Sequence, residues 1–174
     1  MVNASALLGD AFARVRQEVH GVLDGVRQHH LTFQPDGESN TIAWLVWHLT
    51  RIQDDHVAAV AGRGQAWIVD GWKERFHLPF DDSDTGYGHG PKEVLAVTAT
   101  SEILIGYYDA VHHATTHYVR TLDDAALDRV VDERWDPPVT LGVRLVSVIS
   151  DDLQHVGQAA YLRGLAERQD GAGG

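Results

Sequence analysis

The sequence contains no cysteine among its 174 residues. A disulfide framework, a thiolate metal site and a cysteine nucleophile are therefore excluded, and any thiol chemistry must use a thiol from outside the protein. Long apolar runs are also missing, because no stretch approaches the roughly 20 residues that a membrane span needs. The amino terminus has no basic segment followed by an apolar run, the pattern of a secretory signal. These features predict a soluble cytoplasmic protein.

Basic residues are few relative to acidic ones. The 14 lysines and arginines stand against 25 aspartates and glutamates, which gives a formal net charge of −11. Such a surplus of negative charge opposes binding to nucleic acid and to anionic lipid. The expected partner is therefore a small molecule, and a homodimer stays open. The length suits one domain over residues 1–174, in which residues 169–174 are expected to form a disordered tail.

Apolar residues recur at steps of three and four in four segments, which is typical of amphipathic helices. The segments are residues 5–31, 40–61, 91–120 and 140–168. Ser39 or Asn40 is expected to cap the second helix, Pro91 to lie in the first turn of the third, and Thr140 to cap the fourth. A short helix is expected at residues 123–127. The sequence therefore predicts an all-α protein with a four-helix bundle.

Residues 62–90 show no sustained period and are expected to form a long crossover loop between the second and third helices. A loop of this length can return along the bundle, so these two helices are expected to run parallel. Its aromatic residues are Trp67, Trp72, Phe76, Phe80 and Tyr87. We expect the loop to form one wall of a pocket, with Trp72 and Tyr87 as cofactor- or substrate-binding residues. The alternative is that these aromatics form a satellite core.

Asp151, Asp152 and His155 interrupt the apolar face that Leu145, Leu153 and their neighbours predict for the fourth helix. A carboxylate in such a face is unfavourable unless a cation or several hydrogen bonds compensate it. Asp151 and His155 are four residues apart, so their side chains project from one side of the helix. They form two ligands suited to a divalent metal. A histidine hydrogen-bonded to its neighbour's carboxylate is the alternative, and Asp152 is the first substitute for Asp151.

His48 on the second helix is the third candidate ligand. At 100° per residue it lies about 60° from Leu45 and about 40° from Ile52 around that helix, which places it at the edge of the core. Two histidines and one carboxylate leave coordination positions open, as a catalytic metal requires. Asp55 and His56 lie near the same face and are expected to be supporting partners or alternative ligands.

The remaining histidines are interpreted as residues without a metal role. His113 and His117 are four apart, but they lie on the opposite side of the third helix from its apolar seam, so solvent exposure is expected. His112 on the flank and His29 and His30 at the end of the first helix are expected to be equally uninvolved.

Three motifs resemble the DinB-like superfamily of metal-binding four-helix bundles, and more closely its actinobacterial branch of mycothiol-dependent transferases. The motifs are Asn40–Leu49 (NTIAWLVWHL), Asp84–His89 (DTGYGH) and Asp151–Gln158 (DDLQHVGQ). The last is similar to the His-x-x-x-His-x-Gly-Gln pattern of the superfamily. The resemblance implies that the metal ligands are His48, Asp151 and His155. Aspartate at the first position departs from the commoner pattern and leaves zinc, nickel, iron or manganese as the metal.

Two functional hypotheses follow. In the first, the metal binds a low-molecular-weight thiol, which the resemblance identifies as mycothiol, and lowers its pKa for attack on an electrophile. A metal-dependent hydrolase is the variant within this class. In the second, the protein is a non-enzymatic metal-binding bundle that senses or sequesters a small ligand.

Overall fold

The computed structural model of the protein describes residues 3–172. The long helices are α1 (Ala4–Leu23), α3 (Ile42–Ala61), α7 (Ser101–Val119) and α8 (Leu141–Ala172). Side-chain oxygens cap the first turns of all four: Asn3, Thr41, Thr100 and Thr140 accept hydrogen bonds from backbone N–H groups. Such caps satisfy donors that have no partner within the helix. The second long helix is therefore capped by Thr41, not by Ser39 or Asn40.

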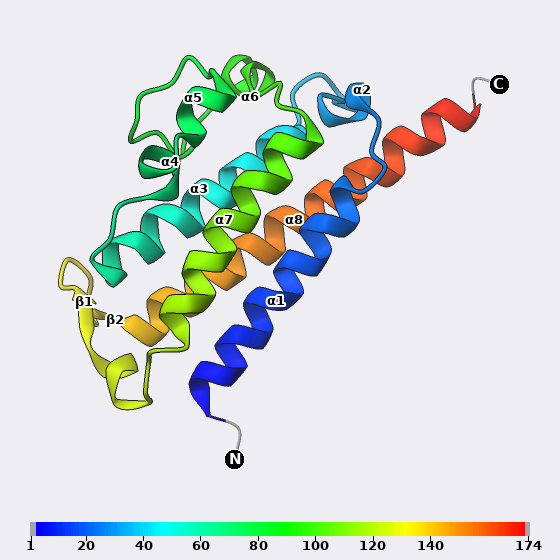
Figure 1. Cartoon of the computed structure of the whole chain (residues 1–174). Helices are drawn as coiled ribbons and strands as arrows, with labels where there is room; N and C mark the ends of the chain where they lie inside the picture. Colours follow the sequence, from blue (N-terminus) through cyan, green and yellow to red (C-terminus); the bar gives the residue numbers. More distant parts are fainter. Residues whose placement is uncertain (1–2, 173–174) are drawn as a thin grey trace.

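Figure 1 shows the four long helices packed side by side, with α1 and α8 running in one direction and α3 and α7 in the other. The helices α7 and α8 each pack against both α1 and α3. Side-chain hydrogen bonds agree with a parallel arrangement of α3 and α7. Arg51 reaches Tyr107 midway along the two helices, and the Tyr118 hydroxyl donates to the Val60 carbonyl near their ends. The all-α expectation is confirmed.

Short elements occupy the connections. They are α2 (Gln28–Leu31), α4 (Ala66–Val69), α5 (Trp72–Phe76), α6 (Pro91–Ala96), the 3-10 helix η1 (Ala125–Asp128), β1 (Val130–Asp132) and β2 (Val139–Thr140). The chain between α3 and α7 carries α4, α5 and α6 along one side of the bundle (Figure 1). The helix expected at 123–127 is the 3-10 turn η1, whereas the two-stranded antiparallel ribbon of β1 and β2 was not expected.

Two of the expected helices are interrupted. The first ends at Leu23, where the C-cap residue Asp24 is extended at ψ 121° and Gly25 follows at a φ of 64°, and the chain then forms α2 separately. The third is broken between α6 and α7. There Val97 is extended at φ −82° and ψ 93°, and Thr100 takes the extended conformation of an N-cap. Threonine competes with the helix by bonding its hydroxyl to nearby backbone N–H groups, which favours a new start.

The expected disordered tail is helical as far as Ala172, the last residue of α8. Asp170 explains this extension, because its carboxylate accepts from His30 at 2.8 Å and pairs with Arg27 at 2.8 Å. These contacts fasten the last turns of α8 to α2 and the residue before it. Residues 173 and 174 of the expected tail lie outside the described residues.

The core consists of two apolar clusters stacked along the bundle. The larger one surrounds Trp47 and Tyr107, and the smaller one contains Phe12, Leu141 and Leu145. Leu153 does not belong to either cluster and is 46% exposed, contrary to expectation. Its place on the buried side of the helix is taken by Asp152, which is fully buried. Within residues 3–172, none of the helices is long and apolar enough to cross a membrane.

Candidate metal centre

His48 of α3 and Asp151 and His155 of α8 lie together at the middle of the bundle. One potential ligand atom from each residue lies within 4.8 Å of the other two. The two helices run antiparallel, and the imidazole rings are 4.8 Å apart between centroids, at 69° to each other. Ligands of a tetrahedral zinc ion with bonds of about 2.1 Å lie about 3.4 Å apart, so small side-chain rotations close the site. The three residues predicted from the sequence are therefore brought together.

The backbone fixes the orientation of His48. Its Nδ1 donates a hydrogen bond to the carbonyl oxygen of Thr85 at 2.5 Å, which leaves Nε2 as the free ring nitrogen with a lone pair. Burial lowers the pKa of His48, and the Thr85 carbonyl opposes this effect only in part. His48 is therefore neutral near pH 7, which is the form that binds a metal.

His155 is held by its own helix. Its Nδ1 donates to the Asp151 carbonyl at 2.8 Å and lies 3.4 Å from Asp151 Oδ2, so the carbonyl takes the hydrogen bond and the carboxylate adds attraction. The neighbouring Asp151 side chain raises the pKa of His155. Its Nε2 is free in the neutral form. Both histidines therefore present Nε2 with the Nδ1 proton tied to a backbone carbonyl, the arrangement common among metal-bound imidazoles.

The two adjacent aspartates have different environments. Asp151 is partly exposed, belongs to the histidine cluster, and its Oδ2 accepts no hydrogen bond. Asp152 is fully buried between helices, with neither carboxylate oxygen hydrogen-bonded, and burial raises its pKa well above the ordinary value. An uncharged Asp152 facing the core is a poor metal ligand, whereas Asp151 offers an unpartnered oxygen beside two imidazoles. Asp151 is therefore the better-placed carboxylate of the candidate site.

The segment Asp84–His89 fixes the orientation of the His48 ring. Trp44 stacks on the His48 ring at 4.6 Å and donates from Nε1 to His89 Nδ1 at 3.1 Å. His89 in turn donates from Nε2 to Asp84 Oδ2 at 3.0 Å, and Asp84 Oδ1 accepts from the Gly86 N–H at 2.7 Å. This closed chain of hydrogen bonds presents the Thr85 carbonyl to His48. The Asp-Thr-Gly-Tyr-Gly-His motif thus orients the candidate ligand His48.

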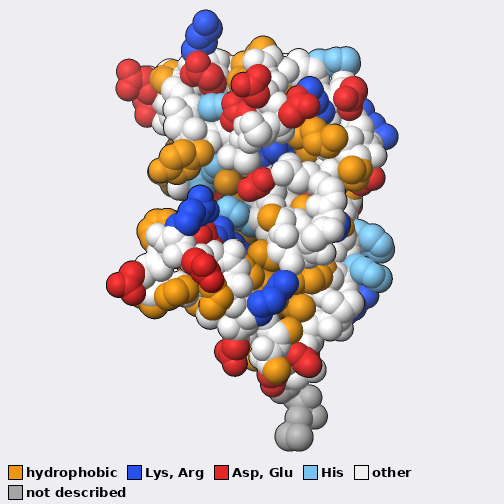
Figure 2. Space-filling view, turned by 90° about the vertical axis from the view of Figure 1, so that its left-hand side faces the viewer, with side chains coloured by type: hydrophobic (Ala, Val, Ile, Leu, Met, Phe, Trp, Pro, Cys, Tyr) orange, Lys and Arg blue, Asp and Glu red, His pale blue; other side chains and the backbone are white. Residues whose placement is uncertain are grey.

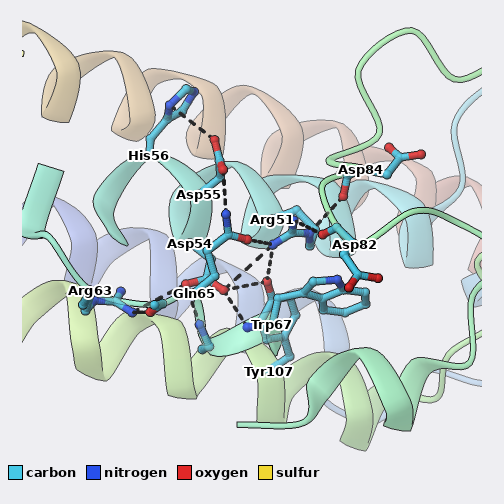
Figure 3. A network of polar contacts seen from close by, with 12 residues as sticks. Arg51, Asp54, Asp55, His56, Arg63, Gln65, Trp67, Asp82, Asp84 and Tyr107 are labelled. Carbon is cyan, nitrogen blue, oxygen red and sulfur yellow. Dashed lines mark hydrogen bonds and ion pairs between the residues drawn. The ribbon is translucent and has the colours of Figure 1, made fainter. Parts of the chain in front are cut away.

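A buried arginine holds this segment onto α3 (Figure 3). Arg51 is fully buried and donates from Nε to the Asp84 carbonyl at 3.1 Å and from a terminal nitrogen to the Asp82 carbonyl at 3.3 Å. Its other terminal nitrogen donates to Gln65 Oε1 at 2.8 Å. Nearby, the buried Asp54 accepts from two backbone N–H groups at the start of α4. Sequence analysis missed this pair, although two charges three residues apart in an apolar helix were the available signal.

A cavity of about 350 Å³ lies beside the site and has Asp151 in its wall. The other residues that line it include Arg144, His56, Tyr87 and Trp135. Tyr87 is 93% exposed and Trp135 is 65% exposed, which is unusual for large aromatic rings. Figure 2 shows histidine atoms at a hollow in one face of the molecule, between hydrophobic and basic side chains. Of the three candidate ligands, Asp151 lines this cavity, which therefore borders the candidate site.

The structure separates the two aromatic residues expected in the pocket. Tyr87 lines the cavity, but Trp72 packs on α7, where its ring centroid lies 5.8 Å from that of Tyr107 and where Gly106 leaves room for it. Trp67, Phe76 and Phe80 also belong to the core or pack against it. Trp72 therefore packs against the larger core cluster and is not among the residues that line this cavity, so a binding role for it stays a prediction. Trp135, from the segment before β2, lines the cavity instead and was not anticipated.

Asp55 and His56 lie outside the cluster of His48, Asp151 and His155. Asp55 accepts a hydrogen bond from Gln65 at 2.7 Å, and His56 Nδ1 accepts one from Arg144 at 3.0 Å. Burial and the nearby Arg144 lower the pKa of His56, so it is neutral. His113 and His117 are exposed, as expected.

His29 and His30 form a second cluster with Asp170, which sequence analysis did not foresee because Asp170 lay in the expected tail. The Asp170 carboxylate also pairs with Arg27 at 2.8 Å. A guanidinium group at that distance repels a cation, so we interpret this cluster as the fastening between α2 and α8.

Comparison with known proteins places the chain in a family. The family model of the DinB superfamily matches residues 11–159, so the chain belongs to the DinB superfamily. A solved structure, described as a conserved protein of locus from Enterococcus faecalis, has a TM-score of 0.87 with this chain at 29% sequence identity. The superposition covers 94% of this chain and 96% of that one. No curated protein matches the chain.

The donor set fits a divalent metal. Two neutral imidazole nitrogens and one carboxylate oxygen suit zinc, nickel, iron or manganese, and three protein ligands leave positions open. The unpartnered Asp151 Oδ2 and the fixed Nδ1 protons of both histidines are consistent with such a site. The absence of any thiolate ligand leaves the soft metals without their preferred donor.

Proposed function

We propose that the protein is an enzyme that transfers a low-molecular-weight thiol to an electrophile at a divalent metal held by His48, Asp151 and His155. The observation that carries this proposal is the cluster of His48, Asp151 and His155, whose ligand atoms lie within 4.8 Å of one another and whose Asp151 lines a cavity. Zinc is the metal we expect first, because it accepts nitrogen and oxygen ligands with three protein donors and one open position.

The chemistry requires a thiolate, and the chain has no cysteine to supply one. When bound, a divalent cation lowers the pKa of a coordinated thiol so that the thiolate is present near neutral pH. The thiol proton leaves to solvent, the sulfur forms a bond to the electrophilic carbon, and the leaving group departs with the electron pair of the broken bond. Tyr87 and Trp135 at the cavity mouth provide apolar surface for the electrophile.

The ligands and their supports have separate tasks in this proposal. His48 and His155 supply lone pairs in a fixed direction, and Asp151 contributes negative charge that offsets the charge of the metal. The Asp84–His89 segment keeps the Thr85 carbonyl on His48. We propose mycothiol as the thiol because of the resemblance to mycothiol-dependent transferases. A thiol panel distinguishes this thiol from others.

Elemental analysis and a turnover assay test the proposal together. The purified protein should hold about one metal ion per chain and conjugate a panel of thiols with 1-chloro-2,4-dinitrobenzene. The variant His48→Ala should lose both metal and turnover, whereas His113→Ala, which removes an exposed histidine of α7, should keep both. Stoichiometric metal without turnover of any thiol would favour a metal-binding sensor. Turnover of ester substrates without thiol would favour a hydrolase.

A further inference from the structure

The cavity beside the metal centre contains a fixed positive charge. Arg144 lies in its wall with a side chain only 18% exposed. One terminal nitrogen donates to His56 Nδ1 at 3.0 Å and the other donates to Asp132 Oδ2 at 3.1 Å. These two contacts use two of the five N–H donors of a guanidinium group. Arg144 is thus held in position while donors remain for another group.

The charge of Arg144 is not fully neutralised by its partner. Asp132 also binds Arg134 through both of its oxygens, at 2.9 and 2.8 Å, so two arginines share one carboxylate. His56 is neutral, because burial and Arg144 lower its pKa. Its Nδ1 accepts from Arg144, so its Nε2 carries the ring proton and is a further donor. The Arg144 end of the cavity therefore offers positive charge and N–H donors to an anion, while the Asp151 carboxylate lies at the other end.

The position of Arg144 relative to the metal centre sets the size of the ligand. Arg144 and Asp151 are seven residues apart on α8, which is two turns and about 10 Å along the helix axis, and both line the cavity. Ser147 and Val148 line the cavity between them. A ligand that reaches both ends must carry its anionic group several bonds away from the atom at the metal. Exposed aromatic rings of Tyr87 and Trp135 beside this path suit a planar or apolar middle part.

We infer that Arg144 is a specificity-determining residue that binds the carboxylate of a small molecule with an apolar or aromatic body. This inference rests on the proposed function, since it assigns the reactive end of that molecule to the metal centre. The carboxylate belongs either to the thiol or to the electrophile. Both have the same recognition chemistry, a bidentate or charge-assisted contact with a guanidinium group.

Binding of benzoate and of benzamide to the metal-loaded protein tests the inference by titration calorimetry. The two molecules share size and an aromatic ring but differ in charge. The protein should bind benzoate about tenfold or more tightly than benzamide, in keeping with a charge-assisted contact. Arg144→Gln should lose this preference. Arg14→Gln removes an equal charge from an exposed arginine of α1 that does not line this cavity, and this variant should keep the preference.

Benzoate could also be preferred over benzamide because its carboxylate binds the metal directly. The variant His48→Ala, which should lose the metal, serves as a second test that separates the two causes. It should keep the preference for benzoate if Arg144 binds the carboxylate, and lose it if the metal does. Equal affinity for the two molecules, or a preference that survives in Arg144→Gln, overturns the inference. These binding results do not depend on turnover, so an inactive protein that still prefers benzoate through Arg144 contradicts only the proposed function.

Kinetic measurements identify the source of the carboxylate once turnover is found. One arm compares 3-mercaptopropionate with 2-mercaptoethanol, and the other compares 4-chloro-3-nitrobenzoate with 1-chloro-2,4-dinitrobenzene. Arg144→Gln should raise KM for the carboxylate member of one pair about tenfold or more and leave its neutral member unchanged. A change in the thiol pair assigns the carboxylate to the thiol, and a change in the other pair assigns it to the electrophile. Equal effects on charged and neutral members overturn the inference.

Discussion

Gly86 packs against the Nδ1 side of the His48 ring: a Cβ atom at Gly86 would lie 2.9 Å from Nδ1 of His48. The same atom would lie 2.9 Å from the Trp47 ring, and Gly86 has a φ of +93°. Gly88 has a similar φ of +80°, yet nothing lies within 4 Å of its Cβ position. The two glycines therefore share an unusual backbone conformation, but only Gly86 presses on a ligand.

This contrast gives a first prediction for Gly86→Ala and its control Gly88→Ala. Each substitution places an L side chain at positive φ, so each should lower the free energy of unfolding by about 1–3 kcal/mol. Only Gly86→Ala should displace the His48 ring, which we expect to weaken metal binding by about tenfold or more. Metal titration and denaturant unfolding measure the two effects. If the variants bind metal equally well, the turn does not position His48.

The adjacent aspartates give a second prediction. Asp151→Asn should reduce bound metal strongly, because it replaces an anionic ligand with a neutral amide. Asp152→Asn should keep the metal, and it should not lower stability at pH 7. The reason is that burial raises the Asp152 pKa, and the amide is a neutral group of similar shape. Elemental analysis and thermal unfolding of both variants check this. Loss of metal from Asp152→Asn alone would assign the ligand to Asp152.

The pH dependence of metal affinity follows from the pKa of His155, which the Asp151 side chain raises above its ordinary value of 6.5. Below that raised pKa a metal must displace a proton, so affinity should fall about tenfold per pH unit. The burial-lowered pKa of His48 adds a second proton only at lower pH. Competition with a metal indicator between pH 5 and 8 measures the slope. An affinity that is constant across this range would exclude His155 as a ligand.

The same raised pKa has an opposite effect on the metal-free protein. The contact of His155 with Asp151 stabilises the fold fully below the unfolded pKa of His155 and loses this contribution as pH rises through the folded pKa. As the pH rises from the unfolded to the folded pKa of His155, the free energy of unfolding of the metal-free protein should therefore increase less than that of the metal-free His155→Gln variant.

The bundle helices could be predicted from local spacing, and the clustering of His48, Asp151 and His155 from that spacing together with the family resemblance. Asp151 and His155 are four apart on one helix, and the apolar period of the second helix fixes the direction of His48. The ends of the helices were harder to predict. The stop at Leu23 depends on the conformation of Gly25, and the extension to Ala172 depends on Asp170 meeting Arg27 and His30, which are distant in sequence.

The residues that line the cavity could not be predicted, because they also come together from distant parts of the sequence. Trp135 and Tyr87 lie 48 residues apart in the sequence and both line the cavity, whereas Trp72, on the expected loop, packs on α7. Aromatic content alone does not show whether a ring in a loop lines a pocket or packs in a satellite core, because it suits both equally well. Arg51 shows the limit most clearly, since its role depends on carbonyl groups of Asp82 and Asp84.

A fourth prediction concerns removal of the metal. Both apolar clusters form without any contribution from the metal ligands, so the bundle should persist in the metal-free state. A chelator should lower the melting temperature, since the metal binds only the folded protein, and should leave the helical circular dichroism at 25 °C nearly unchanged. Complete loss of helicity on chelation would show that metal binding and folding are one step, as in a zinc finger.

The last prediction compares Trp72, which packs against the core, with Trp135, which lines the cavity. The ring of Trp72 packs on Tyr107 and against Gly106, and Arg75 covers it at 4.4 Å from the ring centroid. Trp72→Ala should therefore lower the free energy of unfolding by about 2–4 kcal/mol and leave benzoate affinity unchanged.

Trp135→Ala should behave in the opposite way. Its side chain is 65% exposed and lines the cavity, so its removal should change stability by less than about 0.5 kcal/mol. Benzoate affinity should fall about threefold or more, because the ring supplies apolar surface for the ligand body. Denaturant unfolding measures the free energy of unfolding of each variant, and titration calorimetry measures its affinity for benzoate. A Trp135→Ala variant with normal benzoate affinity would remove this ring from the binding surface, and a stable Trp72→Ala variant with weakened binding would return Trp72 to the pocket.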